Sequence, residues 1–227
     1  MKIEIFQGNE SIQSTAKTLI IIDVLRAGAT AYYLLNSGIN RCLLAQDSNI
    51  AFEIAKRINC ILIGEKQGFK IDGFNFGNSP SEISENNKEL ENKSIVFVTT
   101  NGVTAILNNK HFSEIYFCGF LNAAFTANYI KQKAMEDVAI IASHPTSDDH
   151  MACAEYIKSI LLDDEKNSKQ ETINRIMKSE SAEKFYNSDY FPLVDLHMCC
   201  EEISNPGYVV HTKIDNDYIE LIRNIEI

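Results

Sequence analysis

Residues 18–23 read Thr-Leu-Ile-Ile-Ile-Asp, an apolar run that stops at an acidic residue. Two more runs, Ile-Val-Phe-Val at 95–98 and Val-Ala-Ile-Ile at 138–141, are apolar at every position. A strand with one face in water alternates apolar and polar residues, so unbroken runs indicate strands that are covered on both faces. Such strands are typical of the parallel sheets of α/β proteins.

The rest of the chain alternates short strand-like runs with longer amphipathic stretches. Strands are predicted at 3–6, 18–23, 41–45, 60–64, 94–99, 114–118, 137–142 and 206–213. Helices are predicted at 27–37, 48–57, 104–109, 122–133 and 149–162, with caps at Asp47 or Ser48, at Asn122, and at Ser147 or Asp148. This order predicts a three-layer α/β/α sandwich around a mostly parallel or mixed sheet.

No linker rich in Pro, Gly or Ser divides the chain. We therefore expect a single α/β domain over residues 1–227, or two tightly joined α/β halves. The segment 162–181 is polar and charged, and we expect an exposed loop there with a helix after it.

Composition and charge narrow the classes of partner. The chain has 227 residues, 45% of them hydrophobic, and 21 Lys and Arg against 31 Asp and Glu give a net charge of −10. An acidic surface argues against nucleic acid as the main partner, although a local cationic pocket or a divalent metal can still hold a small phosphorylated molecule. The apolar runs are too short to span a bilayer, and residues 1–6 lack the features of a signal peptide, so we expect a cytoplasmic protein without a membrane partner.

Six cysteines are present, and no two have the Cys-x-x-Cys spacing. Most lie within apolar runs, as Cys42 and Cys60 do. Buried free thiols are therefore expected rather than a zinc cluster.

Charged residues follow two of the predicted strands at their carboxyl ends, where parallel sheets build ligand sites. Asp23 could hold a metal while Arg26 grips a phosphate or sulfonate through two bonds. Alternatively, Asp23 only starts a helix and Arg26 lies on the surface. Glu65 could ligate a metal or act as a base beside Lys66, or the two could form a solvated charge pair in a turn.

Two polar stretches rich in glycine, Asn and Ser or Thr could bind an anion. Residues 73–80, Gly-Phe-Asn-Phe-Gly-Asn-Ser-Pro, can present backbone amides with Asn78 and Ser79, or form a structural turn. Residues 99–102, Thr-Thr-Asn-Gly, lead from a strand into a helix. The free amides of that helix start could seat an anion at Thr100, Asn101 and Gly102, although the P-loop spacing is missing.

The start of the helix predicted at 149–162 carries a pair of carboxylates. Asp148 and Asp149 either cap the helix or give oxygen ligands to magnesium. His144 and His150 flank the pair as acid–base candidates or as incidental residues. Structural roles are expected for His111, His197 and His211, and a weaker candidate site lies at Asp195, Cys199, Cys200, Glu201 and Glu202.

Six elements, taken in chain order from residue 23 to about residue 161, resemble the 2-phosphosulfolactate phosphatase family. They are Asp-Val-Leu-Arg-Ala at 23–27, Gly-Glu at 64–65, Gly-Phe-x-Phe-Gly-Asn-Ser-Pro at 73–80, Thr-Thr-Asn-Gly at 99–102, Gly-x-Leu-Asn at 119–122 and the acidic pair at 148–149. The resemblance implies a magnesium-dependent phosphatase with an α/β fold of its own. The family substrate is (2R)-2-phospho-3-sulfolactate, which is hydrolysed to 3-sulfolactate and phosphate, a step of coenzyme M biosynthesis in methanogens.

Combined with the residues above, this gives a hypothesis for the site. Catalytic roles are expected for Asp23, Arg26, Glu65 and Asp149, and the Mg²⁺ ligands are expected among Asp23, Glu65, Asp148 and Asp149. Substrate contacts are expected from Lys66, Asn78, Ser79, Thr100, Asn101, Gly102 and Asn122. The nucleophile would be a metal-bound water or Asp23 itself. A homodimer is expected because cytosolic α/β enzymes often pair through symmetric patches.

The chain departs from the family pattern at several positions. Asn75 replaces an Asp and Val103 replaces a Thr, which removes a candidate metal ligand and a candidate phosphate donor. The other departures are Gly-Ala-Thr-Ala at 28–31, the Asp-Asp pair at 148–149 and His-Pro-Thr at 144–146. The alternative is therefore a diverged or non-catalytic protein that binds a small anion on the same fold, and a third reading is another metal-dependent enzyme acting on small hydroxyacids or their phosphates.

Overall fold

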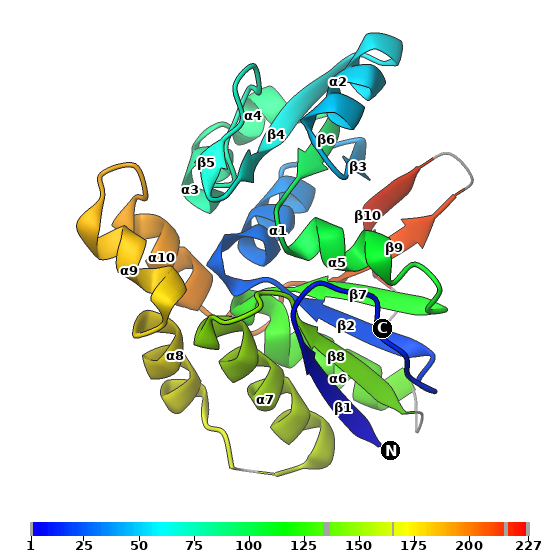
Figure 1. Cartoon of the computed structure of the whole chain (residues 1–227), viewed down its shortest axis with the longest axis vertical. Coiled ribbons are helices and arrows are strands. Elements are labelled where there is room, and N and C mark those ends of the chain that lie inside the picture. The colour runs from blue at the N-terminus through cyan, green and yellow to red at the C-terminus, as the bar shows by residue number, and fades with distance from the viewer. Residues whose placement is uncertain (1, 134–136, 165, 216–217, 226–227) are drawn as a thin grey trace.

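The described part of the computed structural model contains one sheet of ten strands (Figure 1). The structure describes residues 2–133, 137–164, 166–215 and 218–225. The strands are β1 (Ile3–Gln7), β2 (Thr18–Ile22), β3 (Arg41–Leu44), β4 (Cys60–Lys66), β5 (Phe69–Lys70), β6 (Ser94–Val98), β7 (Glu114–Cys118), β8 (Val138–Ala142), β9 (Val209–Ile214) and β10 (Ile219–Asn224). They lie in the order β1-β8-β2-β7-β9-β10-β3-β6-β4-β5.

Two parallel groups of strands make up most of this sheet. The first comprises β1, β8, β2 and β7, and the second comprises β3, β6 and β4. The antiparallel hairpin β9–β10 joins them, pairing Tyr116 with His211 on one side and Leu221 with Cys42 on the other. The predicted α/β class is confirmed, with the sheet mixed.

Helices and single turns connect the strands. The helices are α1 (Ala29–Asn36), α2 (Ser48–Arg57), α3 (Pro80–Glu85), α4 (Asn87–Leu90), α5 (Gly102–Asn108), α6 (Ala123–Lys133), α7 (Asp148–Leu162), α8 (Lys169–Met177), α9 (Glu180–Asn187) and α10 (Leu193–Cys200). Two short turns, η1 (Val24–Gly28) and η2 (Phe120–Asn122), precede α1 and α6.

Side chains that alternate along the second strand group pack on opposite faces. Leu43 and Val96 join an apolar cluster with Ile54 of α2, whereas Cys42 and Ile95 belong to the large cluster that includes helix α1. Helices therefore cover both faces here, as the unbroken apolar run at 95–98 predicted.

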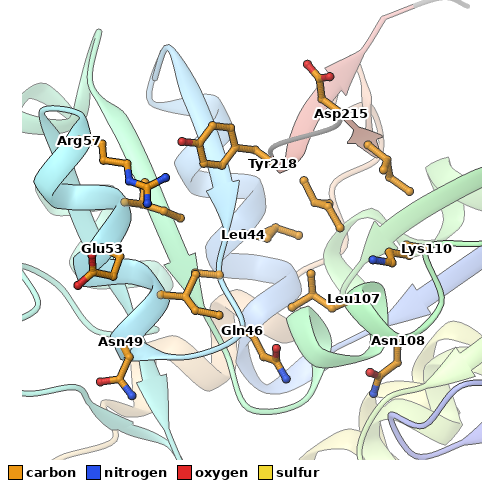
Figure 2. A pocket seen from close by; sticks show the side chains of 15 residues that line it. Leu44, Gln46, Asn49, Glu53, Arg57, Leu107, Asn108, Lys110, Asp215 and Tyr218 are labelled. Carbon is orange, nitrogen blue, oxygen red and sulfur yellow. The ribbon is translucent and has the colours of Figure 1, made fainter.

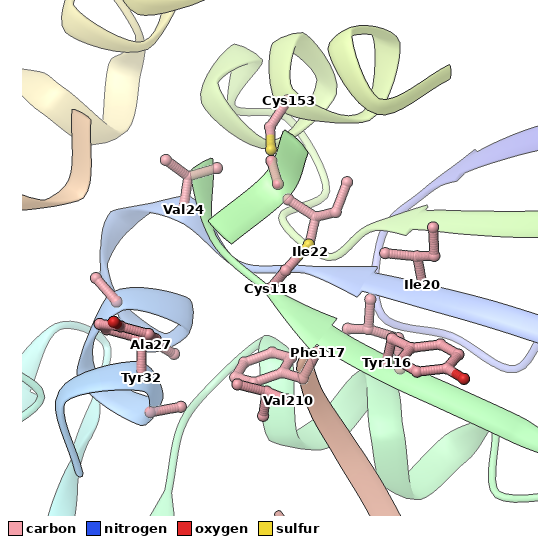
Figure 3. Close-up of a cluster of buried hydrophobic side chains, with 14 of the residues drawn as sticks. Ile20, Ile22, Val24, Ala27, Tyr32, Tyr116, Phe117, Cys118, Cys153 and Val210 are labelled. Carbon is pink, nitrogen blue, oxygen red and sulfur yellow. The ribbon is translucent and has the colours of Figure 1, made fainter. Parts of the chain in front are cut away.

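The large cluster surrounds β2 and β7, where Ile20, Ile22 and Phe117 are fully buried (Figure 3). Cys118 and Cys153 lie in the same region. All six cysteines are free, and four of them are buried, as expected from their apolar surroundings. Burial raises the pKa of Cys42 to about 12, so this thiol stays protonated at neutral pH.

Most predicted elements are found, with boundary shifts of a few residues. Asp47 caps α2, with its side chain accepting a hydrogen bond from the Ile50 amide at 3.0 Å. The sequence did not reveal β5, β10, α3, α4 or α10, whereas α9 corresponds to the helix expected after the segment 162–181. The loop expected at 162–181 is wrong in part, because α8 lies inside the segment and buries Thr172 and Ile176; Glu165 lies outside the described residues. The division into one domain or two tightly joined halves stays a prediction.

The two parallel groups run in opposite senses, because three antiparallel pairings separate β7 from β3. In a flat sheet their carboxyl ends would lie at opposite edges. Figure 1 instead shows one group above the other with their strands inclined to each other, so that the ends of β2, β4 and β6 face the side of the molecule that carries α9 and α10. No described helix is long and apolar enough to cross a membrane.

Candidate active site

A cavity of about 310 Å³ lies where these strand ends converge. It is lined by Asp23, Leu25, Arg26, Glu65, Gln67, Gly68, Asn78, Thr100, Asn101, His144, Pro145, Ser181 and Lys184. The structure thus brings together six of the residues predicted for the site, namely Asp23, Arg26, Glu65, Asn78, Thr100 and Asn101.

Main-chain amides hold the carboxylate of Asp23. Asp23 directly follows β2 and is only 5% exposed. Its Oδ1 accepts a hydrogen bond from the Ala27 amide in η1, and its Oδ2 accepts one from the Gly102 amide at the start of α5, both at 3.0 Å. Such bonds favour a charged carboxylate in a fixed orientation, with lone pairs left over for a ligand.

Glu65, near the end of β4, is held in the same way. Its carboxylate accepts hydrogen bonds from the Thr100 amide, from the Thr100 hydroxyl at 2.9 Å and from the Gly68 amide at 2.6 Å. Thr100 also accepts a bond from the Gln67 amide at 3.0 Å, which ties the loop after β6 to the β4–β5 turn.

These bonds change the role expected for the start of α5. The sequence predicted that its free amides would seat an anion. However, the Thr100 and Gly102 amides are already bonded to Glu65 and Asp23, and the Val103 amide donates to the Thr99 hydroxyl at 3.0 Å. The start of α5 therefore binds the carboxylates of Glu65 and Asp23. The Asn101 amide, which lies between those of Thr100 and Gly102, donates no hydrogen bond to the described residues.

Arg26 is a buried cation with a committed partner. Its Nη1 donates to Asp195 of α10 at 2.7 Å, and its Nη2 donates to the Gly68 carbonyl at 3.2 Å. The guanidinium also lies 5.6 Å from the ring centre of Phe185 and 5.1 Å from that of Phe191. The remaining N–H donors of Arg26 are available to the cavity, which it lines.

Asp195 is completely buried and accepts bonds from the Ser79 hydroxyl at 3.0 Å, the Ser81 amide at 3.0 Å and the Ser81 hydroxyl at 2.6 Å. It therefore acts as a support for Arg26. Only the weaker candidate site at 195–202 hinted at this residue in the sequence.

His150 lies between Asp149 and Asp23, although its Nε2 and Asp149 Oδ2 have no hydrogen-bond partner among the described residues. Its Nδ1 accepts a hydrogen bond from the His144 amide at 3.0 Å, which places the proton of the neutral ring on Nε2. Nε2 lies 3.3 Å from Asp149 Oδ2 and 3.8 Å from Asp23 Oδ1, and all three side chains are buried. Asp149 thus stands behind Asp23 rather than in the cavity wall.

His144 lines the cavity at the loop before α7. Its Nδ1 accepts bonds from the amides of Thr146 at 3.2 Å and Ser147 at 2.9 Å. Burial is the main cause that lowers the pKa of His144 below its ordinary value, and the nearby His150 is the second, so the ring is neutral at pH 7. Because Nδ1 accepts hydrogen bonds, the proton of the neutral ring is on Nε2.

The sequence matches a known protein family over most of its length. The family model described as 2-phosphosulpholactate phosphatase matches residues 6–201. The chain belongs to this family.

Relatives agree with the match. A probable 2-phosphosulfolactate phosphatase of Bacillus subtilis is 36% identical over 230 residues, covering 99% of this chain and 100% of the relative. The 2-phosphosulfolactate phosphatase of Methanocaldococcus jannaschii is 31% identical over 190 residues, covering 75% and 79% of the two chains. A probable 2-phosphosulfolactate phosphatase of Clostridium novyi is 32% identical over 170 residues, covering 71% of each. The predicted enzyme class, a hydrolase of phosphoric monoesters, is confirmed.

Two departures from the 2-phosphosulpholactate phosphatase pattern lie outside the cavity wall. Asn75 is exposed, and its Oδ1 accepts a bond from the Leu62 amide at 2.9 Å, a role that an Asp could also fill. Val103 is fully buried in the core. Neither substitution removes a group that faces the cavity.

Other predicted site residues also lie outside the wall. Lys66 is exposed, Ser79 caps α3 and bonds Asp195, and Asn122 accepts the Gly119 amide at 3.1 Å. Asp148 pairs with Arg175 through two bonds, of 2.9 Å and 2.6 Å. The ligand roles of these four residues stay predictions, and the Gly102 amide bonds Asp23.

Sequence reasoning missed the cavity residues Leu25, Gln67, Gly68, Pro145, Ser181 and Lys184. A capping signal, Ser79-x-x-Glu82 with Pro80 at the first helical position, could have identified α3. Nothing comparable marks Lys184, because only the folding of α9 against the site brings it near.

A second, larger cavity of about 590 Å³ lies between α2, α5 and the β9–β10 hairpin (Figure 2). Leu44, Ile54 and Leu107 give it apolar walls, with Glu53 and Lys110 among its charged residues. It shares no lining residue with the first cavity and holds none of the family motifs.

The donors of the first cavity fit a magnesium ion. Asp23 and Glu65 offer carboxylate oxygens, and Asn78, 5% exposed, has an Oδ1 with no hydrogen-bond partner. The described residues contain no cluster of three His, Cys, Asp or Glu arranged as a metal cage. Magnesium is commonly bound through one or two carboxylates, waters and substrate phosphate, so this donor set suits it.

Proposed function

We propose that the chain hydrolyses 2-phosphosulfolactate to 3-sulfolactate and phosphate, and that it requires Mg²⁺. One observation carries the proposal: Asp23, Glu65 and Arg26, which come from distant parts of the sequence, line a single cavity. The relatives named for this substrate, one of them matching the whole length, support the choice of substrate.

The two carboxylates and Asn78 Oδ1 would hold the ion. A bound Mg²⁺ supplies positive charge that stabilises the phosphoryl oxygens as the ester bond breaks. The amides that bind Asp23 and Glu65 keep these carboxylates in place before the substrate arrives, so little reorganisation is needed during reaction.

The free N–H donors of Arg26 would bind oxygens of the phosphoester. Because Asp195 and Gly68 fix the guanidinium, the donors point in a set direction. His150 Nε2 lies 3.3 Å from Asp149 and 3.8 Å from Asp23 without a hydrogen bond to either, and the buried ring would help to position the Asp23 carboxylate by packing beside it.

The test is phosphate release from 2-phosphosulfolactate and from a panel of phosphomonoesters, with Mg²⁺ and with EDTA. We expect turnover that is fastest with 2-phosphosulfolactate and that stops with EDTA and returns with added Mg²⁺. Turnover that persists under chelation would reject the metal, and a preference for another ester would reject the substrate.

Variants locate the chemistry. Asp23→Asn keeps the size of the side chain but removes its charge, and we expect the loss of nearly all turnover. Asp189→Asn, on an exposed residue after α9, is the matched control and should behave as the parent. Full activity in Asp23→Asn would remove this residue from the mechanism.

Cytoplasmic location and a homodimer stay predictions. Cell fractionation would test the first, and light scattering on the purified chain the second.

A further inference from the structure

Lys184 of α9 lines the cavity, but the chemistry above does not use it. None of the hydrogen bonds and ion pairs of the described residues involves its ammonium group, which is half-buried. The nitrogen lies 5.6 Å from the ring centre of Phe185 and 5.1 Å from that of Phe191. Burial, followed by the nearby Arg26, lowers the pKa of Lys184.

Arg26 provides the contrast. Both cations lie over the same two rings, so they are neighbours. Arg26 is neutralised by the fully buried Asp195, at 2.7 Å. A partly desolvated ammonium without such a partner gains more from a bound anion than a surface lysine does, because less water screens the attraction.

Gly68 separates this cation from the acidic part of the cavity. Its amide donates to Glu65 at 2.6 Å, and its carbonyl accepts from Arg26 at 3.2 Å. A Cβ at Gly68 would lie 3.7 Å from the Lys184 nitrogen. On one side of Gly68 the cavity therefore has the carboxylates that suit a metal-bound phosphoryl group, and on the other it has a cation that makes no ion pair with the described residues, although the charges of Glu65 and Asp23 act on it.

We infer that Lys184 is a specificity-determining residue that binds one of the two acidic groups that the substrate carries besides its phosphoryl group, the carboxylate or the sulfonate. The inference rests on the proposed function and adds to it the residue that selects phosphoesters with a further acidic group. A phosphoester with a neutral alcohol part has no acidic group for the Lys184 ammonium, so this lysine does not increase its affinity for the cavity.

The kinetic experiment compares Lys184→Gln with the parent on two substrates, 2-phosphosulfolactate and glycerol phosphate, which has no second acid. We expect kcat/KM to fall about 10- to 100-fold on the first, mainly through KM, and to change less than about twofold on the second. Lys184→Arg should restore part of the loss. Lys178→Gln, at an exposed lysine just before α9, should match the parent on both substrates.

A binding experiment separates this inference from the proposed function. Calorimetry with 3-sulfolactate, which lacks the phosphoryl group, should show about tenfold or greater weakening in Lys184→Gln, with inorganic phosphate bound as in the parent. Thermal unfolding checks that the variant is folded. Equal weakening of both ligands, or of neither, would overturn the role of Lys184. A parent that binds 3-sulfolactate through Lys184 but releases no phosphate from 2-phosphosulfolactate would overturn the proposed function alone.

Discussion

Asp23 depends on Gly102, the first residue of α5. Its Oδ2 lies against Gly102, where a Cβ would come within 2.8 Å of that oxygen and of the Phe117 ring. Only a residue without a side chain brings the amide this close to the carboxylate. Gly102 of the Thr-Thr-Asn-Gly motif is therefore required because a side chain at this position would collide with the Asp23 carboxylate, and not because a phosphate must approach the backbone here.

Replacing Gly102 by Ala should push the Asp23 carboxylate aside. We expect a loss of about 1–3 kcal/mol in the free energy of unfolding from overpacking. A shift of the carboxylate of this kind should lower turnover on the order of 100-fold. Urea unfolding and phosphate release measure the two effects. Thr104→Ala, on the same helix and half-buried, is the control, and wild-type turnover in Gly102→Ala would contradict the argument.

His144 makes stability depend on pH. Burial, more than the neighbouring His150, lowers its pKa below the ordinary value of 6.5. As pH falls through that value, the unfolded chain binds a proton that the folded chain does not, so the free energy of unfolding decreases. In His144→Gln this contribution is absent, and the decrease between about pH 7.5 and pH 5.5 should be smaller. Urea unfolding at a series of pH values tests this, and identical slopes in the two proteins would refute it.

At the scale of elements, α10 supports the site from outside the family motifs that the sequence displays. It carries Asp195, which receives Arg26 from η1 and two serines from the start of α3. Three elements far apart in the sequence thus share one buried carboxylate. Tyr190, between α9 and α10, accepts a bond from the Lys70 amide of β5 at 2.7 Å and fixes the same region to the β4–β5 turn.

Asp195→Asn should uncouple these elements. The change leaves the Arg26 charge buried without its partner, and losses of about 3–5 kcal/mol in the free energy of unfolding are typical of such changes. The double variant Arg26→Met, Asp195→Leu should lose less free energy of unfolding than the sum of the losses in Arg26→Met and in Asp195→Leu. The reason is that the double variant leaves neither charge buried without its partner. Urea unfolding measures all of them, with Asp189→Asn as the exposed control. Strict additivity would show that the pair is not coupled.

The sequence predicted part of the site and missed the rest for a physical reason. Asp23 directly follows β2, Glu65 lies near the end of β4 and Asn101 lies shortly after β6, so their place at the ends of apolar strands could be inferred. Asp195 and Lys184 lie on short helices, and only long-range packing decides which residues these helices face. The sequence predicted Lys66, the last residue of β4, as a second cation beside Arg26, but Lys66 is exposed and does not line the cavity.

At the scale of the whole molecule, the β9–β10 hairpin joins the two parallel groups. Unbroken apolar runs made the parallel strands predictable from sequence. β10 reads Ile-Glu-Leu-Ile-Arg-Asn, with no clear period, and its place between β9 and β3 depends on partners distant in the chain. The two groups run in opposite directions because of this hairpin. Prediction of the individual strands from sequence could not show this, since it does not reveal how the strands pair.

Leu221→Ala tests whether the hairpin couples the groups. Leu221 is 1% exposed and pairs with Cys42 on β3 and with Thr212 on β9. We expect a loss of about 2–5 kcal/mol in the free energy of unfolding, in one transition seen alike by circular dichroism and tyrosine fluorescence. Ile225→Ala, at a residue 67% exposed just after β10, should change little. Separate transitions would indicate that the two halves unfold independently.

The late position of the hairpin in the chain has a consequence for synthesis. While the ribosome is still translating the residues before Val209, the facing edges of β7 and β3 have no strand to pair with. Open edges of this kind recruit strands from other chains, so a nascent chain is exposed to misassembly until β9 and β10 emerge. We expect premature stop codons just upstream of the hairpin to yield insoluble product rather than a partly active enzyme.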